Sequence, residues 1–165
     1  RALFQILGPL MQNRPGTIAK LPAPALGGAA LLTLGNSAKV PQDVVVTVVD
    51  VRSADGSVLA CLTPSEGAFP DCGEDERAQR RMVRANARVT IVFNDVPPGE
   101  YAISLLHDEN GNGKADTVLF LPKEGFGFSR DAKARFGPPK FSAAAFTVDS
   151  DAPVYQKIRM RYMSR

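Results

Sequence analysis

The sequence has few of the residues that build catalytic and metal centres. It contains no tryptophan, one histidine and two cysteines among 165 residues. So small a supply leaves little material for cofactor cages or thiolate metal clusters. The composition, 44% hydrophobic and 22% charged, is that of a globular protein and excludes disordered and fibrous classes. The length suits one domain with its own core and is too short for two.

Acidic residues are absent from the first 38 positions, which hold three basic residues, Arg1, Arg14 and Lys20. The other positions carry 17 basic and 17 acidic residues, so the net charge of +3 belongs to the leading segment. A nucleic-acid-binding domain concentrates its basic residues in the folded part. The balanced body therefore excludes nucleic acid as the expected partner.

Long apolar runs are also scarce. Residues 21–34 form an apolar stretch of 14 residues, which is too short to span a bilayer as a helix. It follows Arg14 and Lys20, with Met11 as a candidate start, and the small residues around Ala38 come next. This order is typical of a secretory signal peptide. We expect a signal-peptide-like leader at 1–38, with a disordered tail as the alternative, and one domain at 39–165. The protein is then periplasmic or secreted and not membrane-spanning.

The two cysteines agree with export. Cys61 and Cys72 are separated by ten residues that include prolines and a glycine. In an exported protein a pair at this spacing forms a disulfide, worth roughly 3 kcal/mol on the chain-entropy model. A redox or metal role is disfavoured, because the Cys-x-x-Cys spacing and nearby histidines are missing.

The body of the chain reads as strands and turns. Residues 43–52 form a β-branched run, Ala54-Asp55-Gly56 supplies a turn, and residues 57–63 return as the second strand of a predicted hairpin. Alternation places Val89, Ile91 and Phe93 on one face. Further strands are expected at 80–85, 88–93, 101–106, 146–148 and 154–163, with a tight turn at 96–99. Met82 is expected to point inward, as are Ile158, Met160 and Tyr162 of the last strand.

About seven short strands joined by Gly/Pro turns predict an all-β fold, an antiparallel β-sandwich of the immunoglobulin-like or prealbumin-like kind. Residues 125–145 differ, because phenylalanines there alternate with basic residues. The favoured interpretation is that these aromatic side chains plug one end of the sandwich. The alternative is a ligand groove built from His107, Glu124, Phe126, Phe128, Arg135 and Phe136.

One loop has the spacing of a calcium site. If Asp108 takes the first position, Asn110, Asn112, the Lys114 carbonyl and Asp116 fall at the third, fifth, seventh and ninth positions, with Gly113 at the sixth. The twelfth position is Leu119, so the bidentate glutamate is absent and weak Ca²⁺ binding is predicted, on the order of 10⁻⁴ to 10⁻³ M. Glu109 and Glu124 are candidate extra ligands. The same residues are also what a tight turn needs.

Four stretches resemble a known family. Residues 96–102 (VPPGEYA) with 107–116 (HDENGNGKAD), and then 122–129 (PKEGFGFS) with 135–139 (RFGPP), resemble the bacterial family called domain of unknown function 2141. The resemblance implies an exported β-sandwich of Gram-negative bacteria and leaves the activity open. The Cys61/Cys72 pair is not part of it.

Catalysis is not expected, because His107 stands alone without a nucleophile motif. The sequence favours an exported non-catalytic module with a weak Ca²⁺ loop that binds an envelope or extracellular ligand or protein. Two alternatives remain. One is a metal-assisted hydrolase or isomerase that uses His107 and nearby carboxylates, and the other is a carrier of a small apolar ligand.

Overall fold

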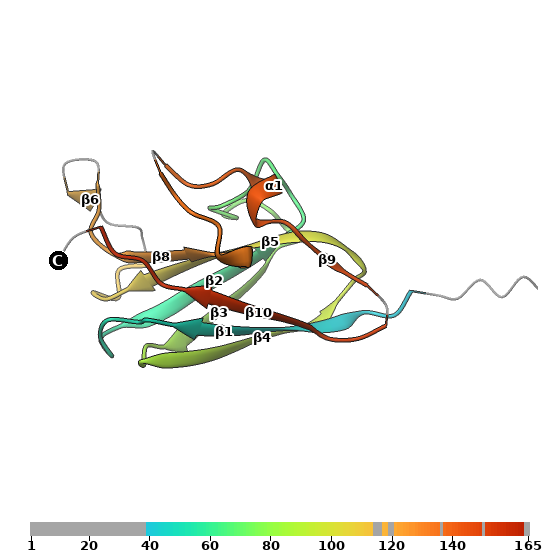
Figure 1. The fold of residues 1–165 in the computed structure, drawn as a ribbon, viewed down its shortest axis with the longest axis horizontal. Coiled ribbons are helices and arrows are strands. Elements are labelled where there is room, and N and C mark those ends of the chain that lie inside the picture. The colour runs from blue at the N-terminus through green and yellow to red at the C-terminus, as the bar shows by residue number, and fades with distance from the viewer. Residues whose placement is uncertain (1–38, 114–116, 119–120, 136, 150, 164–165) are drawn as a thin grey trace, which may run out of the picture. The chain divides into compact units, whose positions relative to one another are not determined.

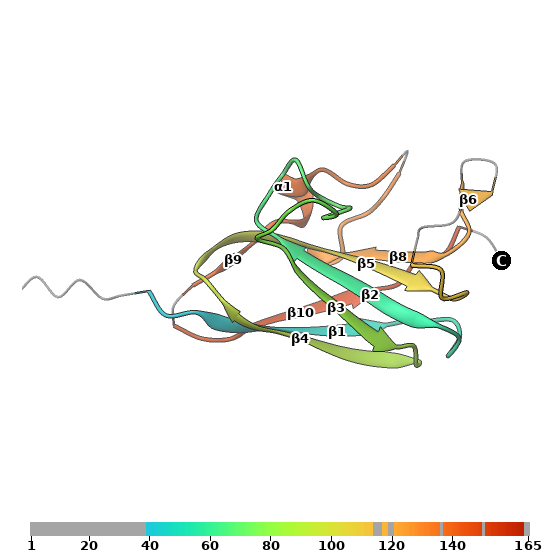
Figure 2. The same cartoon turned by 180° about the vertical axis from the view of Figure 1, so that it is seen from behind.

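The computed structural model describes residues 39–113, 117–118, 121–135, 137–149 and 151–163. The expected leader at 1–38 lies outside these residues. Eight strands form two facing sheets, seen as two layers in Figures 1 and 2. The three-stranded sheet has the order β10-β1-β4, with β1 at Gln42–Val49, β4 at Arg88–Val96 and β10 at Val154–Arg159.

The second sheet has the order β3-β2-β5-β8, and β9 also pairs with β5. Its strands are β2 (Ser57–Thr63), β3 (Gln79–Arg84), β5 (Gly99–Asp108), β8 (Gly125–Phe128) and β9 (Phe146–Val148). A separate small hairpin joins β6 (Thr117–Val118) to β7 (Leu121–Pro122). The prediction of an all-β sandwich is confirmed.

The core lies between the sheets because alternate residues of each strand point inward. Val44, Val46 and Val48 of β1 are fully buried, and Val89, Ile91 and Phe93 of the neighbouring strand β4 lie beside them on the same inward face, as the alternation predicted. Residues of β2, β5, β9 and β10 complete the same cluster. At about 25 cal/mol per Å² of apolar surface, burial of these side chains dominates the stability of the fold.

The predicted hairpin between the first two strands is wrong. β1 pairs with β10 on one side and with β4 on the other, whereas β2 pairs with β3 and β5 in the other sheet. Residues 50–56 therefore cross from one sheet to the other, and Asp50 leaves β1 with a positive φ of 61°. The Asp55-Gly56 turn signal was correct, but a local turn does not determine which sheet the chain enters next.

Three further details differ from the sequence prediction. Met82 points outward and is 68% exposed, because β3 turns Val83 toward the core instead. The pair of β1 with β10 is parallel, whereas an antiparallel sandwich was expected. The last strand is also shorter than predicted and ends at Arg159, although Tyr162 still packs against the core.

Residues 125–135 and 137–145 begin with a strand of the five-stranded sheet, and their aromatic side chains pack on its outer face. They contain β8, the 3₁₀ turn η1 (Ser129–Asp131) and the short helix α1 (Phe141–Ala144). Phe128, Phe141 and Phe69 stack edge-to-face over Ala102 of β5, which makes a second apolar cluster. Figure 1 shows α1 on the opposite side of β5 from β1. The aromatic side chains thus pack on a sheet face and not at the end of the sandwich.

The loop that contains Phe69 is fixed by the predicted disulfide between Cys61 and Cys72. Cys72 is completely buried, and Arg80 donates hydrogen bonds to the carbonyls of Cys72 and Gly73. The loop also accepts a hydrogen bond at Pro70 O from Ser104 Oγ at 2.6 Å. The disulfide therefore fixes the loop that places Phe69 against Phe128 and Phe141.

Candidate functional site

The single histidine lies at the end of β5 inside the sandwich. His107 is 0% exposed, and both ring nitrogens have partners: Nδ1 is 2.8 Å from Tyr162 Oη and Nε2 is 2.9 Å from the Asp55 carbonyl. A carbonyl only accepts, so Nε2 donates to Asp55, and in that tautomer Nδ1 accepts from the tyrosine hydroxyl. Both ring nitrogens are therefore engaged inside the protein, and Glu109 Oε1 lies 3.9 Å from Nδ1. The ring thus joins the end of β5 to Tyr162 and to the Asp55 backbone.

An ion pair closes the same end of the sandwich. Arg52 Nε donates to Glu109 Oε1 at 3.0 Å, Ser53 Oγ donates to the same oxygen at 2.9 Å, and the guanidinium lies 4.4 Å from the centre of the Tyr162 ring. The hydrogen bond from Arg52 lowers the pKa of Glu109, and partial burial opposes this. The same bond raises the pKa of Arg52, and burial raises that of Tyr162. We name Arg52, His107, Glu109 and Tyr162 the end cluster.

The predicted calcium loop follows directly. Asp108 is buried, and its carboxylate accepts three backbone hydrogen bonds, from Gly111 and Asn112 at Oδ1 and from Gly113 at Oδ2, between 2.8 and 3.1 Å. Asn110 Oδ1 accepts a further one from the Asn112 N–H at 3.0 Å. The loop has the turn chemistry that Asp and Asn provide.

The other predicted metal ligands, Lys114 and Asp116, lie outside the described residues. Within the residues that the structure does describe, no group of three or more His, Cys, Asp or Glu side chains could hold a metal ion. Glu109, a candidate extra ligand, is engaged by Arg52.

The predicted ligand groove is not assembled. In the register of β5 with β8, His107 pairs with Gly125 and Leu106 with Phe126. Since successive residues of a strand face opposite sides, His107 points into the core while Phe126 and Phe128 lie on the outer face. Glu124 is buried and Arg135 is exposed, whereas Phe136 lies outside the described residues. The sheet itself separates His107 from Phe126 and Phe128.

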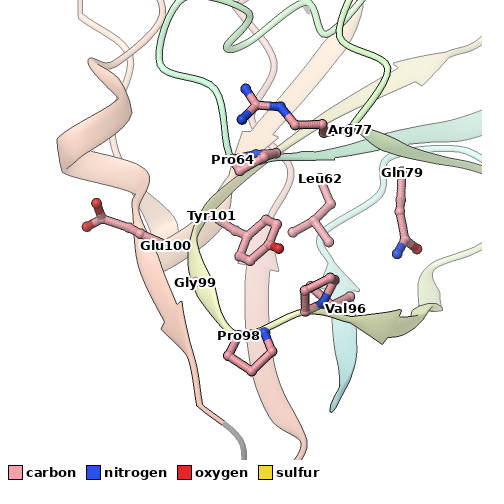
Figure 3. A pocket seen from close by; sticks show the side chains of 10 residues that line it. Leu62, Pro64, Arg77, Gln79, Val96, Pro98, Gly99, Glu100 and Tyr101 are labelled. Carbon is pink, nitrogen blue, oxygen red and sulfur yellow. The ribbon is translucent and has the colours of Figure 1, made fainter. Parts of the chain in front are cut away.

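A different recess lies at the opposite end of β5. It has a volume of about 450 Å³ and lies beside the turn between β4 and β5. The Tyr101 ring stands at its wall, and Glu100 points away from that ring (Figure 3). Burial raises the pKa of Tyr101, opposed by nearby Arg77, so the hydroxyl remains a donor at neutral pH. The lining residues are Leu62, Pro64, Arg77, Gln79, Val96, Pro97, Pro98, Gly99, Glu100 and Tyr101.

Sequence reasoning missed this recess and half of the end cluster. Residues 96–99 were read as a tight turn, although two adjacent prolines before an inward tyrosine are a usable signal for a rigid apolar wall. Arg52 gave no signal, because its partner Glu109 is 57 positions away. Tyr162 was predicted to face inward, but its contact with His107 was not.

Comparison with known proteins adds a family. The family model described as an uncharacterized protein conserved in bacteria, DUF2141, matches residues 46–156. No curated protein and no solved structure matches the chain. A search of the described residues for a helix long and apolar enough to cross a membrane finds none.

Proposed function

The chain belongs to the bacterial family DUF2141, and from this premise we propose that it is an exported, non-catalytic β-sandwich module that binds a ligand or partner protein outside the cytoplasm. The matched residues run from β1 into β10 and so cover the sandwich. No activity is attached to the family, and the proposal therefore depends on the chemistry of the residues themselves.

The state of His107 carries the non-catalytic part of the proposal. A general base must present a free nitrogen to a substrate. His107 is fully buried, and its Nδ1 is hydrogen-bonded to Tyr162 and its Nε2 to the Asp55 carbonyl. This arrangement speaks against the alternative of a hydrolase or isomerase, because the histidine that would act as its general base has no free nitrogen. The alternative of an apolar carrier is also weakened, because Phe128 is buried against Phe69 in the second cluster.

Turnover can be tested directly. The purified full-length chain is assayed against chromogenic esters, phosphates and glycosides, beside the His107→Gln variant, whose fold is checked by circular dichroism. The proposal expects no turnover that depends on His107. Activity in the wild type that disappears in a folded His107→Gln variant would overturn it.

Export is supported by two independent features. The disulfide between Cys61 and Cys72 is stable in an oxidising compartment, and the segment before Lys39 has a signal-like order of basic, apolar and small residues. Cell fractionation of the untagged chain should place it in the periplasm or the medium. Recovery from the cytoplasm with free thiols contradicts this part of the proposal.

Weak Ca²⁺ binding at the loop from Asp108 to Asp116 belongs to the same proposal. Three N–H donors hold the Asp108 carboxylate at the start of the loop, and two carboxylate oxygens offer about four lone-pair directions, which leaves one for an ion. Asn110, Asn112, the Lys114 carbonyl and Asp116 would supply the remaining oxygens. With two carboxylates, binding in the 10⁻⁴ to 10⁻³ M range is expected, as in extracellular modules.

A thermal melt of the full chain in EDTA and in millimolar Ca²⁺ tests the loop. At ten times Kd the ion should add about 1.4 kcal/mol and raise Tm by a few degrees. Asp116→Asn should abolish the shift, and it leaves the hydrogen bonds of Asp108 in place. Equal melting curves in EDTA, Ca²⁺ and Mg²⁺ refute an ion site and reduce the loop to a turn.

A further inference from the structure

Three outer strand edges of the two sheets, those of β10, β8 and β4, are covered by other parts of the described chain. The β10 edge contacts η1, where Asp131 Oδ1 accepts the Arg159 N–H at 3.3 Å. The β8 edge is bridged to Arg161, whose backbone exchanges two hydrogen bonds with Phe126 at 2.9 Å each. An exposed strand edge can pair with a strand of another chain, and contacts of this kind prevent such pairing.

The β4 edge is covered by side chains from β3. Arg81 Nε donates to the Val92 carbonyl at 3.2 Å, and Gln79 Nε2 donates to the Asn94 carbonyl at 3.0 Å. These bonds close the gap between the sheets along this side of the sandwich. The outer edge of β3 pairs with no further strand among the described residues, since β3 is the terminal strand of its sheet and pairs with β2 alone. One side chain of β3 returns to its own backbone, where Arg81 donates to the Arg80 carbonyl at 3.0 Å.

This open edge has one sign of charge. The strand reads QRRMVR, with arginines at 80, 81 and 84 and no acidic residue. Arg84 is exposed, and Arg88 follows beyond the turn. Between Arg80 and Arg84 the exposed Met82 extends an apolar row that continues through Leu59, Leu106 and Phe126 on the same face.

Charge decides which partner fits. A second copy that paired β3 against β3 would bring arginines opposite arginines, which destabilises a strand pair. Glutamates opposite Arg80 and Arg84 would stabilise the pair instead, and an apolar residue between them would lie beside Met82. We propose that the β3 edge accepts an extended acidic segment of a partner protein as an additional strand of the five-stranded sheet, by β-augmentation. This inference rests on the proposed binding function and names its partner class.

A designed peptide probes the edge. The blocked heptapeptide Thr-Glu-Thr-Val-Thr-Glu-Thr places its glutamates and valine on one strand face with the spacing of Arg80, Met82 and Arg84. Titrated into the ¹⁵N-labelled full chain, it should shift the amide signals of residues 79–84 saturably. The matched peptide with lysine in place of glutamate should bind at least about fivefold more weakly, because two favourable cross-strand pairs become repulsive.

Two controls separate strand addition from simple attraction of charges. Two N-methylated peptides are compared, one methylated at the odd residues and the other at the even residues. Because alternate N–H groups point to opposite edges of a strand and only one edge of the peptide faces β3, only one of the two should lose binding. Arg84→Glu should weaken binding at least about fivefold, and Lys157→Glu, an equal charge change on β10, should not.

Several outcomes overturn the inference. They are the absence of saturable shifts, shifts located away from β3, equal binding of the lysine peptide, and equal binding of both N-methylated peptides. A Ca²⁺-dependent Tm shift combined with a failed peptide titration would reject the β3 edge and leave the calcium part of the proposed function intact.

Discussion

Removal of the Tyr162 hydroxyl should cost the sandwich about 2 kcal/mol. This oxygen accepts the Arg52 backbone N–H at 3.0 Å and donates to His107 Nδ1 at 2.8 Å. In Tyr162→Phe the Arg52 N–H can turn to water, because it is exposed. His107 Nδ1 is buried and loses its hydrogen-bond partner, and an unpaired buried polar atom costs about 1–3 kcal/mol. The phenylalanine ring keeps the stacking of Arg52.

Urea denaturation and thermal melts of the full chain measure this cost. A loss of about 2 kcal/mol lowers Tm by roughly 5–10 °C for a domain of this size. The matched control is Tyr155→Phe, since Tyr155 is 73% exposed on β10 and its loss should change stability by less than about 0.5 kcal/mol. Equal stabilities of the two variants would refute the structural role assigned to His107, and with it the main argument against catalysis.

Three other perturbations have defined expectations. Gly127→Ala places a Cβ 2.9 Å from a core side chain and should destabilise by about 1–3 kcal/mol in chemical denaturation, whereas Gly67→Ala, whose Cβ meets nothing within 4 Å, should be close to neutral. Replacement of Cys61 and Cys72 by serine should cost roughly 3 kcal/mol in the same assay; a stability equal to that of the wild type contradicts the role of the disulfide. Because the folded pKa of Glu109 lies below its ordinary value of 4.5, the wild type gains stability from the ionised group above that pH and loses it as the pH falls further. Glu109→Gln should therefore show a shallower fall in the urea midpoint through this range, and identical slopes would argue against the Arg52 pair.

The sequence predicted what local patterns determine. Strict alternation identified the inward face of β4, and turn residues at Asp55-Gly56 marked a true reversal of the chain. The spacing of Asp and Asn after His107 anticipated a tightly hydrogen-bonded loop. Each of these depends on neighbours within a few residues, where propensity and periodicity act.

Features that depend on topology were not predictable in this way. The face of β3 was misassigned, because a strand with three arginines offers no apolar alternation to read. The partition of β1 and β2 between sheets, and the meeting of Arg52 with Glu109, follow from how distant strands pair. The candidate groove involves the same dependence on topology: the pairing of β5 with β8 puts His107 on the inner face of the sheet and Phe126 and Phe128 on the outer face.

The parallel pairing of β1 with β10 makes the order of synthesis matter. Val44 pairs with Val154, so the central strand of the three-stranded sheet lacks one neighbour until a segment 110 residues later has emerged. A long loop must close before this contact forms, which slows folding of such topologies. A nascent chain that has not yet reached Val154 keeps one side of β1 unpaired and its apolar face incompletely covered. The sandwich is thus completed late, and residues 154–162 are the least suitable place for a truncation.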